Sequence, residues 1–110
     1  MKGGGLAKLA ALSGAMAVIA GAFGAHGATG KPAEWLRTGG EYQMVHAVAA
    51  LVATKIARSP LAAGLLLAGS VLFAGTLYGM ALGGPRWLGA VTPVGGFGMI
   101  AGWVVLAARV

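Results

Sequence analysis

The stretch from Leu61 to Gly83, LAAGLLLAGSVLFAGTLYGMALG, contains no charged residue. A transmembrane α-helix needs about 20 apolar residues to cross the ~30 Å of hydrocarbon in a bilayer. This stretch is therefore long enough to cross with some tilt. It predicts that the lipid bilayer is the solvent of at least part of the chain.

The composition of the whole chain is typical of a membrane protein. Hydrophobic residues make up 58% and charged residues only 9%, whereas a soluble domain carries about 25% charged residues. The 21 glycines do not indicate disorder, because disordered chains are poor in apolar residues, and we expect them to serve close helix packing. The chain has no cysteine, which excludes disulfides, thiolate metal sites and a thiol nucleophile. The net charge of +6 comes from basic residues scattered among apolar segments, as membrane anchors are, so no nucleic-acid partner is expected.

Three further apolar segments predict an all-α fold, a single domain that forms a four-helix transmembrane bundle with antiparallel up-down topology and glycine-rich contacts. The expected spans cover residues 6–26, 41–57, 61–83 and 88–108. The first has the basic start and small residues of a signal peptide, but we interpret it as a membrane span. The second is short, and Arg58, Ser59 and Pro60 close it with a charge and a helix breaker. The polar residues 27–40 are expected to form a loop with one helical turn after Pro32.

Small residues at four-residue intervals predict where helices approach closely in lipid. Gly75, Gly79 and Gly83 form a double GxxxG row, the strongest packing motif in the chain. The full set of predicted helix-packing glycines is Gly21, Gly75, Gly79, Gly83, Gly95 and Gly96. Near the start of the last span, either Thr92 is the N-cap with Pro93 at the first helical position, or the helix begins near Trp87 and kinks at Pro93.

Most of the internal polar chemistry lies in residues 41–46, Glu-Tyr-Gln-Met-Val-His. Tyr42 and His46 are four residues apart, and Gln43 and His46 three apart, so these side chains share one helix face. Polar side chains at membrane depth normally face the bundle interior and find partners there. Because the second span is short, we expect these polar side chains to lie at the headgroup boundary or just below it. Four spans bring them to one membrane face with other polar residues, and the candidate ligand-binding set is His26, Tyr42, Gln43, His46 and Arg86.

Several catalytic and transport chemistries do not fit this sequence. A proton-coupled exporter would need an acidic residue inside a span, whereas both glutamates, Glu34 and Glu41, lie in or beside the first loop. A zinc hydrolase needs about three protein ligands, but the chain has two histidines and no aspartate; a Ser-His-Asp arrangement is excluded as well. The two histidines leave two alternatives: a haem or quinone site, or a structural role in which His26 caps the first span and His46 bonds a neighbouring helix. We favour the structural role, and we expect no cofactor, no metal and no enzymatic activity.

Five groups of residues, in order along nearly the whole chain, resemble one known family. They are Gly21–Gly27 (GAFGAHG), Tyr42–Ala47 (YQMVHA), Gly75–Tyr78 (GTLY), Arg86–Gly96 (RWLGAVTPVGG) and Ala101–Trp103 (AGW). The family is that of the YgdD-like proteins, which includes the eukaryotic transmembrane protein 256 group. The resemblance implies a small four-span protein, in bacteria of the inner membrane, whose molecular function is uncharacterised. Val45 departs from the pattern, since many relatives have an aromatic residue there, and this weakens any role that needs a ring at that position.

The basic residues predict an orientation for the bundle. One side carries Lys2, Lys8, Lys55, Arg58 and Arg109, and the other carries Lys31, Arg37 and Arg86. The positive-inside rule then places both termini in the cytoplasm, with the bundle in the inner (plasma) membrane. Abundant helix-contact sequence without an assembled catalytic set favours a structural or accessory bundle that packs with itself or with a larger membrane complex. The alternative is a small-ligand, quinone or haem binding or transport site at the non-cytoplasmic leaflet.

Overall fold

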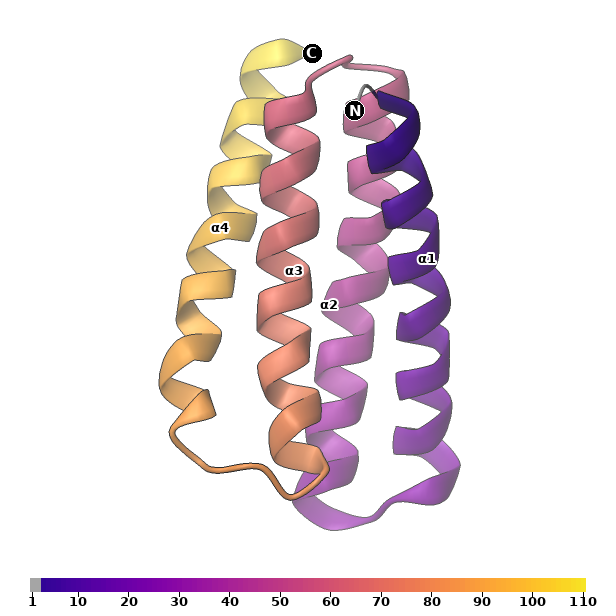
Figure 1. Cartoon of the computed structure of the whole chain (residues 1–110), viewed down its shortest axis with the longest axis vertical. Coiled ribbons are helices and arrows are strands. Elements are labelled where there is room, and N and C mark those ends of the chain that lie inside the picture. The colour runs from indigo at the N-terminus through magenta and orange to yellow at the C-terminus, as the bar shows by residue number, and fades with distance from the viewer. Residues whose placement is uncertain (1–2) are drawn as a thin grey trace.

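A computed structural model of the chain describes residues 3–110, which fold into four long antiparallel helices (Figure 1). They are α1 (Gly3–Ala22), α2 (Gly30–Lys55), α3 (Pro60–Ala81) and α4 (Leu88–Arg109), and a π-helical turn, η1 (Phe23–Gly27), extends α1. The predicted all-α fold of four helices is confirmed. Lys2, one of the basic residues used for the orientation, lies outside the described residues.

The helices lie side by side in sequence order, so each packs mainly against its neighbours along the chain (Figure 1). Within residues 3–110, three segments are long and apolar enough to cross a membrane: Gly4–Gly27, Pro60–Ala81 and Leu88–Arg109. The helix α2, which contains the predicted span 41–57, is not one of them. In the most apolar part of the segments Gly4–Gly27 and Leu88–Arg109, 22% of the residues are buried within the protein. In the segment Pro60–Ala81, the buried share is 56%. The helices α1 and α4 are therefore the flanks of the bundle, and most of their surface faces outward.

The helix α2 differs most from the sequence prediction. Residues 27–40 were predicted to form a loop, but the chain is helical from Gly30 onward and α2 has 26 residues. A Gly-Gly pair is typical of a linker, whereas here both glycines contact a neighbouring helix. A Cβ on Gly39 would lie 2.6 Å from Cε1 of Tyr78 in α3, and one on Gly40 would lie 3.1 Å from the carbonyl oxygen of Ala17 in α1. Packing on both sides outweighs the low helix propensity of glycine, which is why the prediction was wrong.

The closest approach of two backbones lies between α3 and α4. A Cβ on Gly69 would lie 2.6 Å from the backbone nitrogen of Met99, and one on Gly95 would lie 2.5 Å from that of Phe73. Both positions are buried. Only glycine fits at such a crossing, because any side chain would meet the backbone of the other helix.

The predicted packing glycines occupy different environments. Gly95 lies in the α3–α4 contact, and a Cβ on Gly79 would meet Leu88 of α4. The backbone of Gly21 borders Gly40, and Gly83 follows the end of α3. Gly75 and Gly96 have nothing within 4 Å of an added Cβ. The contact face of α3 is thus centred on Gly69 rather than on the GxxxG row that begins at Gly75. Four-residue spacing identifies a row of small residues but does not say which row meets a partner.

The α2–α3 turn is closed by a side-chain cap. Ser59 is the N-cap of α3, and its Oγ accepts a hydrogen bond of 3.1 Å from the backbone N–H of Ala62. Pro60 follows at the first helical position, where its missing N–H is not needed. The predicted break at residues 58–60 is confirmed.

The α3–α4 turn depends on a left-handed glycine. Gly83 has φ +96°, a conformation that glycine adopts without strain. The N–H of Gly84 donates to the carbonyl of Gly79 (2.8 Å) and the N–H of Gly83 to that of Met80 (3.1 Å). These two bonds are the Schellman pattern that ends helices, so Gly83 serves to terminate α3.

The start of α4 settles the two alternatives at Thr92 and Pro93. The helix begins at Leu88 and continues through Pro93, so Thr92 is not its N-cap. The Thr92 hydroxyl instead donates to the carbonyl of Leu88 (3.2 Å) and shares a 2.6 Å hydrogen bond with the hydroxyl of Thr76 in α3. Thr92 therefore tightens the first turn of α4 and joins it to α3.

Candidate functional site

Gln43, on α2, joins three helices through its side-chain amide. Its Nε2 donates a 3.0 Å hydrogen bond to Oγ of Ser13 in α1, and its Oε1 accepts a 2.6 Å hydrogen bond from the hydroxyl of Tyr78 in α3. The side chain is buried, with 4% exposure. A buried amide is costly unless it is paired, and here two neighbouring helices supply the partners.

His46, one turn further along α2, makes the connection to the fourth helix. The indole Nε1–H of Trp103 in α4 donates to its Nε2 at 3.0 Å, and the two rings meet edge to face with centroids 5.7 Å apart. An indole N–H can only donate, so Nε2 is the acceptor and the imidazole is neutral, with its hydrogen on Nδ1. That Nδ1–H donates to the backbone carbonyl of Tyr42 at 2.6 Å. Both ring nitrogens of His46 therefore have partners: Nε2 joins α2 to α4, and the bond from Nδ1 within α2 fixes the orientation of the ring.

These bonds lie halfway along the bundle, not near its end. Gln43 is the middle residue of α2, about 20 Å from Gly30 at 1.5 Å per residue. Ser13 lies within about 4 Å of the middle of the segment Gly4–Gly27 by the same rise per residue. These residues lie near the middle of α2 rather than at its start, because α2 begins eleven residues earlier than the predicted span. Their place at the headgroup boundary stays a prediction.

The structure does not bring the whole predicted ligand-binding set together. Tyr42, Gln43 and His46 lie on adjacent turns of α2, and the Tyr42 ring packs on that of Phe73 in α3 with centroids 4.7 Å apart. His26 lies in η1 and is exposed, and Arg86 is exposed in the α3–α4 turn. A ligand held by all five residues is not supported.

A haem bound between the two histidines is excluded by their positions. A Cβ on Gly14 would contact Ala47, which places the level of His46 near Gly14 of the antiparallel α1. His26 is twelve residues further along the same segment, or about 18 Å. Two axial ligands must bind one iron, so this pair cannot do so. In the part of the chain that the structure describes, no group of three or more His, Asp, Glu or Cys side chains could hold a metal ion.

The predicted ligand-binding set did not include three members of the polar network: Ser13, Tyr78 and Trp103. Trp103 is 42% exposed, and its indole N–H is bonded to His46. The available signal was that each is a polar group within an apolar helix, and such groups normally face partners. Their pairing depends on the relative register of the helices, which the sequence alone does not give.

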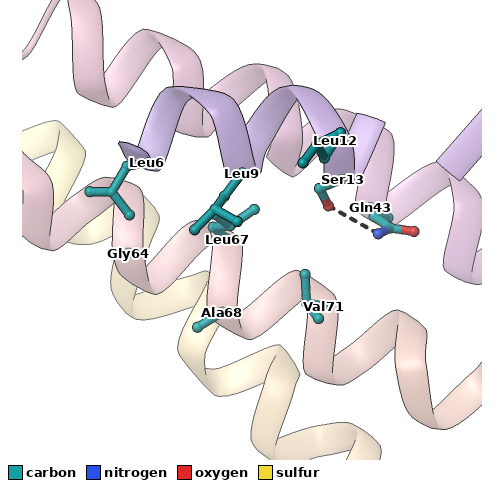
Figure 2. A pocket seen from close by; sticks show the side chains of 9 residues that line it. All are labelled: Leu6, Leu9, Leu12, Ser13, Gln43, Gly64, Leu67, Ala68 and Val71. Carbon is teal, nitrogen blue, oxygen red and sulfur yellow. Dashed lines mark hydrogen bonds between the residues drawn. The ribbon is translucent and has the colours of Figure 1, made fainter. Parts of the chain in front are cut away.

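A groove between α1 and α3 passes directly over the Ser13–Gln43 bond (Figure 2). It has a volume of about 550 Å³ and is lined by Leu6, Leu9, Leu12 and Ser13 of α1, Gln43 of α2, and Gly64, Leu67, Ala68 and Val71 of α3. We call this hollow the α1–α3 groove. None of its lining residues is charged, and Ser13 and Gln43 supply its polar side chains.

The sequence of the chain matches the family described as "Protein of unknown function (DUF423)" over residues 20–96, more than half of the chain. The chain belongs to this family. The matched region of the family contains Gln43, His46 and Tyr78, whereas Ser13 and Trp103 lie outside it. No solved structure matches the chain.

Curated relatives of the family are similar to this chain over most of their length. The UPF0382 membrane protein SERP0230 of Staphylococcus epidermidis is 44% identical over 107 residues, which cover 89% of this chain and 88% of that protein. YwdK of Bacillus subtilis is 42% identical over 109 residues, covering 89% of each. The UPF0382 inner membrane protein YgdD of Escherichia coli is 39% identical over 107 residues, covering 88% of this chain and 82% of YgdD. The predicted resemblance to YgdD-like proteins is confirmed, and the chain is a membrane protein of an uncharacterised family.

Proposed function

We propose that this protein is a non-enzymatic structural or accessory bundle, which packs with itself or with a larger membrane complex. The observation that carries the proposal is the use of the polar side chains halfway along the bundle. The carbonyl oxygen and one amide hydrogen of Gln43, and both ring nitrogens of His46, are hydrogen-bonded to other helices or to the backbone. Groups committed in this way serve assembly rather than chemistry on a substrate.

The helix α2 is the centre of this assembly. Its Gln43 bonds α1 and α3, and its His46 bonds α4. Interhelical hydrogen bonds within membranes contribute about 0.6 kcal/mol on average and up to about 1.7 kcal/mol. Three such bonds on adjacent turns fix the rotation and the register of α2 relative to its neighbours.

The outer faces of the two flanking helices are where a partner would bind. On α4, Val94, Phe97, Ile100 and Val104 are each more than half exposed, and on α1 so are Leu12, Val18 and Ile19. Lipid tails satisfy such a surface, and so does another helix. These exposed apolar surfaces support an accessory role in which the outer face of one flanking helix contacts lipid and that of the other contacts a protein partner.

We further propose that the bundle lies in the bacterial inner membrane with both termini in the cytoplasm. The relative YgdD is named an inner membrane protein. The end of the bundle with both termini also holds the α2–α3 turn (Figure 1), and Lys55 and Arg58 lie there. An excess of basic residues favours the cytoplasmic side. A reporter active only in the cytoplasm, fused to the C-terminus, would be active in this orientation and inactive in the opposite one.

The accessory role is tested by extracting the membrane in lipid discs without detergent and measuring the mass of the particle that contains the protein. We expect a protein mass well above the 10.8 kDa of one chain. Because the chain has no cysteine, Phe97→Cys on α4 and Leu12→Cys on α1 each provide a single crosslinking site without background. Crosslinking from one flank and not the other identifies the contact face. Single chains in the discs, with no crosslink from either flank, would contradict the proposal.

A further inference from the structure

The α1–α3 groove has the dimensions and lining of a ligand site. Its volume of about 550 Å³ is within the roughly 300–1,000 Å³ of small-molecule sites. A second apolar hollow of about 340 Å³ lies further along the same two helices, lined in part by Met16, Ile19 and Phe23 of α1 and by Leu82 of α3. Both hollows lie along α1 and α3, and each is lined mainly by apolar side chains.

Two hydrogen-bond donors lie at the floor of the groove. The Ser13 oxygen accepts from Gln43, and its own hydroxyl hydrogen has no acceptor among the residues that the structure describes. The Gln43 amide has two hydrogens, of which one is bonded to Ser13. Both side chains line the groove (Figure 2) and are more than nine-tenths buried. An unused donor in apolar surroundings gains most from a ligand that can only accept.

The depth of these donors restricts the chemistry of the ligand. Ser13 lies within about 4 Å of the middle of the membrane-spanning candidate Gly4–Gly27, and the hydrocarbon core of a bilayer extends ~15 Å on either side of its midplane. The ester groups of a phospholipid lie at the edge of that core and do not reach the donors. A charged group is also disfavoured there, because no lining residue carries a compensating charge. The remaining class is a neutral, lipid-soluble molecule with a carbonyl acceptor.

We propose that the α1–α3 groove binds a lipid-soluble quinone, with a ring carbonyl at Ser13 and Gln43 and its isoprenoid chain along α1 and α3. The carbonyl oxygens supply the acceptors that the floor lacks, and the chain fills the apolar hollows. The site is halfway along the bundle and uses neither His26 nor Arg86. The inference concerns binding only, and it is independent of whether the bundle has a protein partner.

Blocking the groove gives the first test. Gly64 lines the groove, and a Cβ there would meet nothing within 4 Å, so Gly64→Leu fills the hollow without disturbing helix packing. Gly96→Leu is the matched control, because an added Cβ there is equally unobstructed but lies on α4. We measure equilibrium retention of decylubiquinone by the full chain in phosphatidylcholine nanodiscs, with empty nanodiscs subtracted. We expect saturable binding that Gly64→Leu abolishes and Gly96→Leu retains.

The second test addresses the acceptor. Ser13→Ala removes one donor and should weaken binding roughly three- to tenfold, the effect of one hydrogen bond. Ser70→Ala is the matched control, because Ser70 is buried, bonds the carbonyl of Leu67 and does not line the groove; it should leave binding unchanged. Decylbenzene, which has the chain but no carbonyl, should bind at least threefold more weakly than decylubiquinone.

Three results would overturn the proposal. The first is retention by the full chain no greater than by empty nanodiscs. The second is equal binding of decylubiquinone and decylbenzene, which would make the groove a place for any apolar chain. The third is conversion of an oligomer to single chains by Gly64→Leu and not by Gly96→Leu, which would assign the groove to a helix of a second copy.

Discussion

Replacing Gly95 by alanine tests how strongly the α3–α4 contact stabilises the bundle. A Cβ there would lie 2.5 Å from the backbone nitrogen of Phe73 and 2.6 Å from the carbonyl oxygen of Gly69, whereas ordinary contact begins at 3.4 Å. Both neighbours are helix backbone, so neither can yield by rotating a side chain, and the two helices must separate by almost an ångström. Overpacking costs about 1–3 kcal/mol, and we expect the upper end of that range.

Gly96→Ala is the control, because the adjacent residue has nothing within 4 Å of an added Cβ. Both substitutions gain about the same helix propensity, ~1 kcal/mol, so the difference between the two variants isolates the clash. We expect Gly95→Ala to be about 3 kcal/mol less stable than Gly96→Ala. The assay is reversible unfolding in bicelles, followed by far-UV circular dichroism. Equal stabilities of the two variants would refute the inferred close approach of α3 and α4.

Three further substitutions test individual contacts. Trp103→Phe keeps an aromatic ring but leaves Nε2 of His46 without its donor. This substitution should lower the free energy of unfolding by about 1 kcal/mol. If the losses from Trp103→Phe and His46→Ala are additive in a double-mutant cycle, the bond contributes nothing. Ser59→Ala removes the cap of α3 and should cost about 1 kcal/mol, with faster amide exchange in the first turn of α3; unchanged exchange at Ala62 would contradict the cap. Gly83→Ala imposes a left-handed conformation on a residue with a Cβ and should cost about 1–2 kcal/mol, whereas Gly83→Asn should cost less, as measured by the shift of the unfolding midpoint.

The helical fold could be predicted because it depends on local composition. The charge-free run from Leu61 to Gly83 requires a helix in lipid whatever its neighbours are, and the break at Ser59 and Pro60 follows from cap chemistry. The helix over residues 30–40 could not be predicted in this way. Its polarity and its Gly-Gly pair are typical of a loop, and only the contacts of Gly39 and Gly40 with two other helices account for its structure.

The candidate site was predictable in part for the same reason. Helical periodicity places Gln43 and His46 on one face of α2 and predicts that they face the interior. It does not give the partners, because Ser13, Tyr78 and Trp103 meet them only once the helices have a defined register. The position of the network along α2 likewise depends on where that helix begins, which its packing determines.

The spacing of the polar contacts along the chain has a consequence for biosynthesis. His46 is bonded by a residue 57 positions later, and the second partner of Gln43 comes 35 positions later, whereas its first partner, Ser13, precedes it by 30. At about 5–20 residues per second, translation needs roughly 3–11 s to deliver Trp103 after His46. During that interval α2 has only α1 and α3 to bind its polar face. The bundle therefore matures from the N-terminus, as a hairpin that α3 and then α4 join. A nascent chain that stalls before α4 leaves Nε2 of His46 without its donor.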